Sequence, residues 1–384
     1  MDDKILATSK SRFTYLDNVR SLVIILVITM HTAVTYSGFG DWYYVEGSQS
    51  KLSIFETVFF AFYQSFLQAW FMGILFFISA ILAARALAKH GSLNFIRERL
   101  FRLGLPLLVY VFVISHFILF VLLGINSENS FPKNYIQFII NFQWLGATGP
   151  LWYVEALLIF CIVYAVLKNI FPNGIKIRDI NSANIVLIII TTGIVAFLVR
   201  LVFPIGSSFL NLQFSYFTSY IVMFILGILI GENDLLEKIT DEKNIKWLKL
   251  SLIIGIPLWV FIMTLMVAGG ALDGKVYYNG GLHWQSFAFA LWESLIAIGF
   301  SIGLIAFFRK KVNFDNKFTG LMRDNAFGIY FLHAPILIGV SLLLKRLILE
   351  PVLKFAVVTI SVSVICLILS FLIRKIKPIG ILLK

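Results

Sequence analysis

The sequence predicts an all-α polytopic membrane protein of about ten transmembrane helices, with both termini in the cytoplasm. Hydrophobic residues make up 59% of the 384 residues and charged residues only 14%, whereas a soluble domain carries about 25% charged residues. Ten apolar segments are long enough to cross a bilayer, which takes about 20 residues each. Because one soluble core could not bury so much apolar surface, we expect lipid to cover it.

The predicted spans follow one another with short connections, so we expect a single membrane-embedded domain over residues 1–384. They are residues 19–37, 57–84, 103–124, 150–168, 184–203, 213–231, 248–268, 285–308, 325–344 and 352–373. The second segment is long and is expected to tilt or to extend past the bilayer. Within the sixth, Gly227 and Gly231 form a GxxxG pattern, which indicates close packing against another helix.

Basic residues set the orientation of these spans. If the amino terminus is cytoplasmic, most of the 32 Lys and Arg residues fall on the cytoplasmic side. The seven on the outer side are Lys51, Lys133, Arg200, Lys275, Lys345, Arg346 and Lys354. Cytoplasmic loops carry such an excess in membrane proteins. The net charge of +12 therefore reflects topology, and no nucleic acid is expected as a partner.

The outer loops contain many aromatic residues. Trp42, Tyr43 and Tyr44 lie in the first of them, and Tyr277 and Tyr278 lie in the fourth. Such rings commonly anchor a protein at the membrane interface. The alternative is a rim that binds an acceptor, because aromatic faces suit sugars.

Ionisable side chains within the predicted spans are few, and such residues are usually functional because their burial in lipid is costly. They are His31, His116, Glu155, Arg200, Glu293 and His333. We assign no role beyond packing to His116 or Glu293. Arg200 lies near an outer end and is expected to reach the headgroups. Cys161 and Cys366 lack metal-ligand spacing, so no metal site is predicted.

Arg20 and His31 are the most informative pair. His31 follows Arg20 by eleven positions. In a helix this spacing corresponds to three turns plus about 20° and to a rise of roughly 16 Å, so both side chains project from one face. Arg20 then lies at the cytoplasmic headgroups and His31 near the middle of the bilayer. A neutral imidazole at that depth can act as a base. The alternative for His31 is a hydrogen-bonded packing residue.

Two further arginines precede the third span. Arg99 and Arg102 are three residues apart and share a helical face. Arginine clusters bind phosphate groups strongly, which makes both residues candidates for a phosphate site. The alternative is that they anchor the loop at lipid headgroups.

The fourth and ninth spans supply two more candidates. Glu155 lies about one turn into the fourth span, where it could orient a histidine, bind acceptor hydroxyls or pair with another charge. His333 lies near the middle of the ninth span, two residues before Pro335. Proline removes a helical hydrogen bond and can kink the helix. His333 at such a kink could line a cavity, and the alternative is that it packs against other helices.

Five segments together resemble acyltransferase family 3, over essentially the whole chain. They are Arg20 with His31 eleven residues later, Phe76-Phe77-Ile78-Ser79-Ala80, Arg99-Leu100-Phe101-Arg102-Leu103 with Pro106, Leu151-Trp152-Tyr153, and Tyr330-Phe331-Leu332-His333-Ala334-Pro335. Ala80 stands where the family has glycine. The stretch from Pro150 to Phe160 is most similar to the glucan biosynthesis protein C branch, which is associated with succinylation of periplasmic glucans.

The resemblance implies an acyltransferase of groups other than aminoacyl groups, in a bacterial plasma membrane. It would move an acetyl or succinyl group from cytoplasmic acyl-coenzyme A to a hydroxyl of an extracytoplasmic glycan or other envelope acceptor. Arg20, Arg99 and Arg102 would bind the donor's phosphates. His31 would act as base or carry the acyl group, with Glu155 or His333 orienting it. Acyl-coenzyme A is a substrate here, and no permanently bound cofactor is expected.

Other functions are compatible with the same pattern. Ten spans with polar groups at mid-membrane also suit a transporter or exporter of an envelope metabolite, although the sequence has no evident internal repeat. An inactive family member that serves as a scaffold or lipid flippase is a third hypothesis. Lipid is an expected partner in each case, and a homo-oligomer is compatible with all three.

Overall fold

The computed structural model describes residues 13–125, 131–270, 277–380 and 382–383, and within them it contains helices and no β-strand. Ten of the helical segments in these ranges are long and apolar enough to cross a membrane, which confirms the predicted fold class. The α-helices are α1 (Thr14–Ser37), α2 (Ile54–His90), α3 (Ser92–Arg99), α4 (Leu105–Val109), α5 (Phe131–Ile140), α6 (Trp152–Ile170), α7 (Ser182–Arg200), α8 (Phe217–Glu232), α9 (Leu236–Ile239), α10 (Ile245–Ala268), α11 (Trp284–Leu295), α12 (Ser301–Lys311), α13 (Lys317–Leu343), α14 (Pro351–Ile373) and α15 (Lys377–Gly380).

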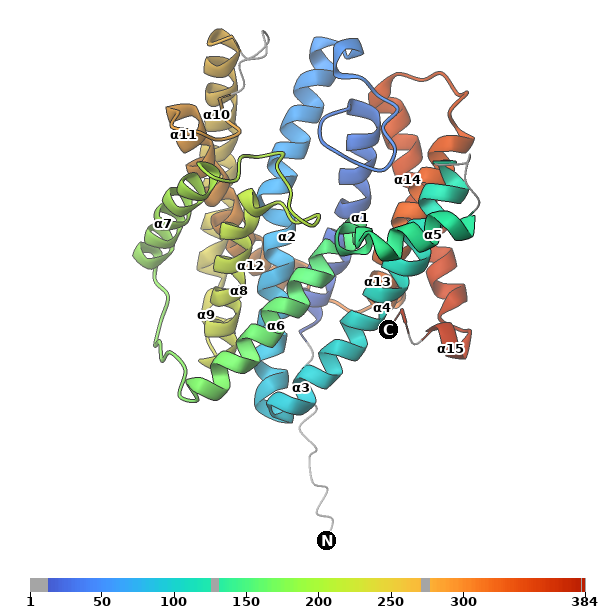
Figure 1. Ribbon diagram of the computed structural model, residues 1–384. Coiled ribbons are helices and arrows are strands. Elements are labelled where there is room, and N and C mark those ends of the chain that lie inside the picture. The colour runs from blue at the N-terminus through green and yellow to red at the C-terminus, as the bar shows by residue number, and fades with distance from the viewer. Residues whose placement is uncertain (1–12, 126–130, 271–276, 381, 384) are drawn as a thin grey trace.

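The long helix α2 runs through the bundle (Figure 1). It begins at a capping box in which the Ser53 hydroxyl accepts from the Glu56 amide while the Glu56 carboxylate accepts from the Ser53 amide. Its 37 residues correspond to about 55 Å of helix, which exceeds the roughly 30 Å hydrocarbon core. The helix is therefore long enough to extend past the bilayer, which is one of the two arrangements predicted for the second span.

Helices α2 and α8 make the most extensive helix contact in the bundle. A β-carbon on Gly227 would lie 2.4 Å from the Phe77 carbonyl oxygen and 2.6 Å from the Ala80 methyl. One on Gly231 would lie 2.9 Å from the Ala84 methyl. The GxxxG pattern is thus a packing surface, as predicted. The glycine that allows the close approach is on α8, which explains how α2 accommodates Ala80.

The third span begins earlier than predicted. The basic segment expected to be a loop is the helix α3, and the helix continues through α4 as far as Leu122. Three π-helical turns interrupt it, over Leu100–Gly104, Tyr110–Ile114 and Phe117–Leu122. The apolar pattern could not reveal α3 because its arginines and glutamate interrupt the apolar run.

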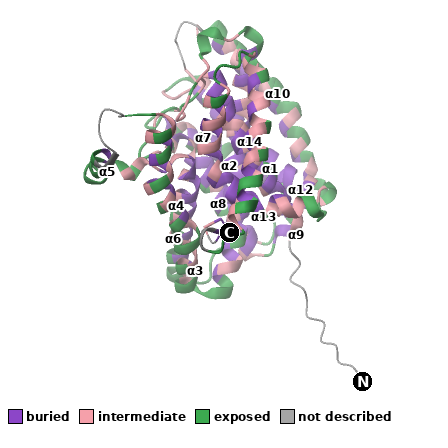
Figure 2. Ribbon diagram, turned by 90° about the vertical axis from the view of Figure 1, so that its right-hand side faces the viewer, coloured by how far each residue is buried: buried purple, intermediate pink, exposed green. Residues whose placement is uncertain are grey.

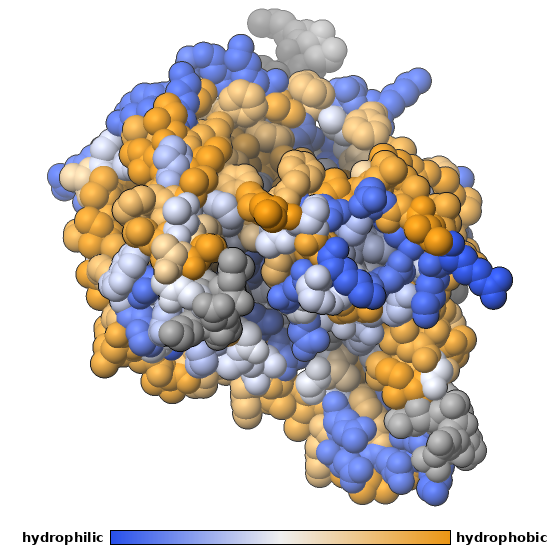
Figure 3. Space-filling view, turned by 90° about the horizontal axis from the view of Figure 1, so that it is seen from above, coloured by the Kyte–Doolittle hydropathy of each residue, from blue (hydrophilic) through white to orange (hydrophobic). Residues whose placement is uncertain are grey.

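Buried residues concentrate along the middle of the bundle, whereas α3 and α5 at its periphery are largely exposed (Figure 2). The eighth span, formed by α11, a π-helical turn over Ile296–Phe300 and α12, is the most buried of the ten, and α14 is the least buried. Viewed from the end opposite the amino terminus, hydrophilic residues lie across the middle and hydrophobic residues predominate around the margin (Figure 3). This distribution suits a protein surrounded by lipid.

Arg200 does not extend toward the headgroups as the sequence analysis predicted. Its side chain is 1% exposed and forms an ion pair and hydrogen bond with Glu293 of α11. The Arg200 Nε also donates to the Ser215 carbonyl at 3.3 Å. A buried arginine requires a carboxylate partner. The sequence contained that partner 93 residues away, where spacing alone could not connect the two.

Candidate active site

A cavity of about 90 Å³ lies between α1, α2, α6, α13 and the π-helical turn that precedes α4. Each of the five segments that resemble acyltransferase family 3 contributes one lining residue. These are Arg20, Ser79, Leu103, Tyr153 and Tyr330. Segments separated by up to 310 positions therefore meet around one space, although each was identified from sequence alone.

Hydroxyl groups form one wall of the cavity. The Ser79 and Tyr153 hydroxyls are 2.9 Å apart, and either can donate. The Tyr330 hydroxyl donates to the Pro150 carbonyl, which joins α13 to the turn before α6. These bonds fix the two tyrosine rings, so α2, α6 and α13 hold a defined polar surface opposite the aliphatic residues of α1 and α2.

Arg20 and His31 lie on the side of α1 that faces α13. Arg20 lines the cavity beside Tyr330. His31, higher on α1, stacks against His333, with ring centroids 5.2 Å apart and planes inclined by 19°. One turn of α13 therefore connects the cavity to the histidine pair, and the shared face predicted from the eleven-residue spacing is present.

The two histidines differ in their surroundings. His333 is fully buried, and its Nδ1 is hydrogen-bonded to the Tyr330 carbonyl. Because a carbonyl only accepts, Nδ1 carries the proton and a neutral ring has its lone pair on Nε2. That Nε2 is buried and has no partner in the structure. His31 is less buried than His333.

Trp42 covers His31. Their ring centroids are 3.8 Å apart and their planes differ by 18°. Next to Trp42, Tyr43 packs its hydroxyl against Gly149, where a β-carbon would lie 2.2 Å from that oxygen. Burial raises the pKa of Tyr43, so its hydroxyl stays protonated at neutral pH. The loop between α1 and α2, which the sequence predicts to be the first outer loop, therefore folds back over His31.

Three contacts hold this loop in place. Lys354 of α14 forms an ion pair with Glu46. The amides of Glu46 and Gly47 donate to the Thr35 carbonyl at 2.8 and 2.9 Å. A β-carbon on Gly47 would lie 1.9 Å from the Tyr36 carbonyl oxygen, so only glycine permits the loop to pack this closely on α1.

The other two arginines are placed differently. The Arg99 Nε is buried without a partner, and both Arg20 and Arg99 are close enough to Tyr153 to interact electrostatically with it. The Arg102 side chain is 62% exposed and pairs with Glu98 at 3.2 Å. Arg20 therefore lines the cavity and Arg99 lies near Tyr153 of the cavity wall, whereas Arg102 is not among the lining residues. The donor-binding role of all three remains a prediction.

Glu155 lies apart from the histidines. Tyr153, Val154 and Leu157 of α6 line the cavity, and at 100° per residue Glu155 projects from the opposite side of that helix. It lies next to the Thr148 hydroxyl, and its Oε2 is buried without a partner. Its predicted role in orienting His31 has no supporting contact among the residues that the structure describes, and the role in acceptor binding stays a prediction.

Ser79 and Tyr153 received no site role from the sequence, and Trp42 received only the alternative of an acceptor rim. Ser79 and Tyr153 lie in the family-like segments, and that position is a signal for a shared site. Trp42 lies in an outer loop whose aromatic residues suggested interfacial anchoring or an acceptor rim. Only the folded chain shows that this loop returns to His31.

Comparison with known proteins decides the family. A family model described as an acyltransferase domain matches residues 13–374. The chain belongs to acyltransferase family 3. It is therefore a multi-pass membrane acyltransferase, and the convergence of its five family-like segments on one cavity agrees with that assignment. No curated protein and no solved structure matches it.

Proposed function

We propose that this family 3 member is an O-acyltransferase that works across a bacterial plasma membrane. It would take an acetyl or succinyl group from acyl-coenzyme A on the amino-terminal side and transfer it to a hydroxyl of an envelope glycan on the other side. The observation that supports this proposal best is the alignment of Arg20, Tyr330, His333 and His31 along α1 and α13. The glucan-succinylating branch is the subgroup we favour.

The donor would enter the cavity where Arg20 lines it and Arg99 lies near Tyr153. Guanidinium groups bind phosphate oxygens with strong charge-assisted hydrogen bonds, and Arg99 has a buried donor to offer. The cavity volume of about 90 Å³ is below the roughly 300 Å³ of an ordinary ligand pocket. We therefore infer that the spans around it separate when the pantetheine arm enters.

His31 would carry out the proton transfer. Its imidazole removes the proton from the acceptor hydroxyl as the oxygen attacks the thioester carbon. The C–O bond forms, the C–S bond breaks, and the proton passes from the imidazole to the departing thiolate, which leaves as free coenzyme A. His333 would hold His31 in place through ring contact. The other route passes through an acyl-histidine intermediate on His31 and gives the same products, the acylated acceptor and free coenzyme A.

The acceptor would approach beneath the first outer loop. Trp42 offers an aromatic face next to His31, and the ring of Tyr43 packs against Trp42. Aromatic faces pack against the apolar faces of sugar rings, so these two rings support a glycan acceptor.

The test uses purified protein in proteoliposomes with isotopically labelled acetyl- and succinyl-coenzyme A and a panel of envelope glycans. We expect covalent label on a glycan together with release of one coenzyme A per acyl group transferred. Absence of label with every donor would contradict the proposal. Movement of a glycan across the vesicle membrane without any donor would instead favour a transporter.

A further inference from the structure

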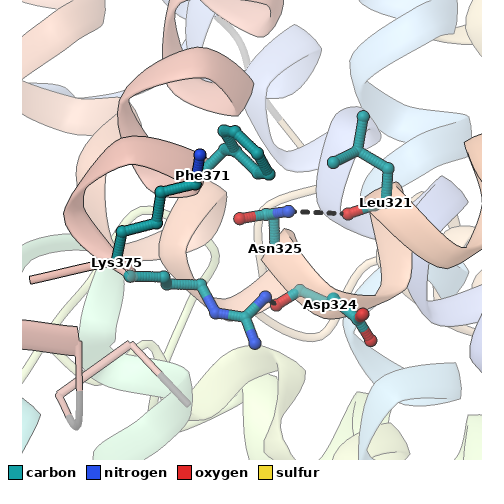
Figure 4. A pocket seen from close by; sticks show the side chains of 6 residues that line it. Leu321, Asp324, Asn325, Phe371 and Lys375 are labelled. Carbon is teal, nitrogen blue, oxygen red and sulfur yellow. Dashed lines mark hydrogen bonds between the residues drawn. The ribbon is translucent and has the colours of Figure 1, made fainter. Parts of the chain in front are cut away.

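A second cavity lies between α13 and α14, away from the proposed transfer site. Its volume is about 190 Å³, and the residues around it are Leu321, Asp324, Asn325, Phe371, Arg374 and Lys375 (Figure 4). The segment just before α13 is hydrogen-bonded to Asn18 near the start of α1, through the Val312 and Phe314 carbonyls. The cavity is therefore at the amino-terminal end of the bundle, where the basic residues gather.

Two cations in this cavity have unused capacity to bind an anion. One amino group of Arg374 donates to the Asp324 carbonyl, but its Nε is buried without a partner. The Lys375 ammonium lies 4.1 Å from the centroid of the Phe371 ring, and no carboxylate among the described residues pairs with it. A cation–π contact at an exposed position is weak, so an anionic group can readily recruit this ammonium.

The acidic residue in the cavity wall does not cancel this charge. The Asp324 carboxylate already pairs with Arg323 at 3.3 Å, and Arg323 also pairs with Asp315 at 2.9 Å. The Asn325 amide donates to the Leu321 carbonyl at 2.8 Å, and its oxygen accepts from Ser370 at 3.0 Å. The remaining charge of the lining is therefore positive.

The surface that leads into the cavity is apolar and faces lipid. Helix α14 has the smallest buried share of the ten spans. Its last two turns expose Ile368, Phe371 and Leu372, whose side chains are between 43% and 52% accessible. A ligand that fits both features has an anionic head and hydrocarbon tails.

We propose that this cavity binds the phosphate group of an anionic phospholipid from the leaflet on the amino-terminal side. Arg374 and Lys375 would hold the phosphate oxygens, and the acyl chains would lie along the exposed face of α14. A guanidinium matches phosphate geometry through paired donors, and anionic lipids are attracted to basic residues at the membrane surface. The site is independent of the acyl-transfer proposal, since it shares no residue with the first cavity.

The experiment measures lipid retained by the full-length protein after reconstitution into nanodiscs and extraction into detergent. The nanodiscs contain phosphatidylcholine alone or an equimolar mixture of phosphatidylcholine and phosphatidylglycerol, and native mass spectrometry counts the bound lipid. We expect wild-type protein to retain phosphatidylglycerol selectively. Lys375→Gln should lower that retention about five-fold, and Arg374→Gln should lower it further.

Lys89→Gln is the matched control, because Lys89 is an exposed lysine at the end of α2 and lies outside the cavity. It removes the same charge and should retain lipid as the wild type does. Equal retention by Lys375→Gln and wild type would overturn the proposal, as would an equal loss in Lys89→Gln. Thermal unfolding in detergent verifies that each variant is folded. Lys375→Gln keeps the test valid if Arg374→Gln is unstable, because among the described residues the Lys375 ammonium contacts only the Phe371 ring.

A separate arm distinguishes lipid from soluble phosphate. Inorganic phosphate is added to delipidated protein, and its binding is measured by the shift in unfolding temperature of wild type and Lys375→Gln. We expect phosphatidylglycerol to stabilise the wild type selectively and inorganic phosphate to have little effect. Stabilisation by inorganic phosphate without any by phosphatidylglycerol would show that the ligand is a soluble phosphate and would contradict the lipid proposal.

Discussion

At the residue scale, Arg20 and Arg102 illustrate what a motif does and does not specify. Each belongs to one of the five segments that resemble acyltransferase family 3, and both were predicted to bind phosphate. In the folded chain both pair with a carboxylate of their own helix, Asp17 and Glu98 respectively, but Arg20 lines the cavity whereas Arg102 does not and is mostly exposed. Arg102 lies within the π-helical turn over Leu100–Gly104, and residue spacing does not reveal such a turn.

This contrast gives a prediction for the donor. Arg20→Ala should raise the KM for acyl-coenzyme A about ten-fold or more, because it removes a charged hydrogen bond to phosphate. Arg102→Ala should change that KM by less than about two-fold, since an exposed ion pair contributes little. Steady-state kinetics in proteoliposomes would measure both. Equal effects of the two substitutions would argue against the placement of the donor at Arg20.

Trp42 supports a second prediction at this scale. Its ring is stacked on His31, so Trp42→Ala should free the imidazole and lower kcat about two- to ten-fold, the value of an aromatic contact. Trp42→Phe should restore most of the rate. The KM for acyl-coenzyme A should stay unchanged in both variants, because the donor phosphates bind at the other end of the path. A rise in that KM without a fall in kcat would contradict the positioning role.

At the scale of elements, the apolar pattern was sufficient to predict the ten spans, but their ends were less accurate. Continuous apolar runs identify helices in lipid because every backbone group must bond within its own segment. Polar ends such as α3 escape that signal. The partners of buried charges also escape it, as Arg200 and Glu293 show, because pairing between distant helices depends on packing.

The contact between α2 and α8 allows a direct test of packing. Gly227→Ala would place a methyl group within 2.4 Å of the Phe77 carbonyl oxygen, and such overpacking typically costs about 1–3 kcal/mol. We expect a lower unfolding temperature in detergent. Gly339→Ala on α13 is the control, since nothing lies within 4 Å of its added carbon, and its greater helix propensity should leave stability unchanged or slightly raised. Equal stability of Gly227→Ala and wild type would mean that the helices are farther apart.

At the scale of the whole molecule, the charge distribution predicts which end of the bundle faces the cytoplasm. Lys51 and Lys89 lie near opposite ends of α2, so Lys89→Cys should be shielded from a membrane-impermeant maleimide in intact cells and Lys51→Cys should react. Cys161 and Cys366 are buried and should contribute little background. Labelling of Lys89→Cys alone would reverse the orientation and place the donor site on the wrong side of the membrane.

The arrangement of the whole chain also shows why the site could be predicted only in part. Chemistry alone singled out Arg20, His31 and His333. In the structure His31 stacks against His333, and Arg20 lines the cavity. Trp42 and the Ser79–Tyr153 hydrogen bond could not be selected in this way, because their importance comes from contacts between segments far apart in the chain. Glu155 also has suitable chemistry, but it projects from the side of α6 opposite the cavity lining, so its role stays a prediction.

The most direct test of the proposed role of His31 compares the rates of acyl transfer by wild-type protein and His31→Ala. Both are measured in proteoliposomes that contain equal amounts of protein. Loss of the general base should lower kcat by at least about 100-fold, while acyl-coenzyme A binding and the unfolding temperature stay close to those of the wild type. His116→Ala, at a buried histidine packed against Phe138 outside the cavity, should retain the rate if it remains folded. Transfer at the wild-type rate by His31→Ala would contradict the proposed mechanism.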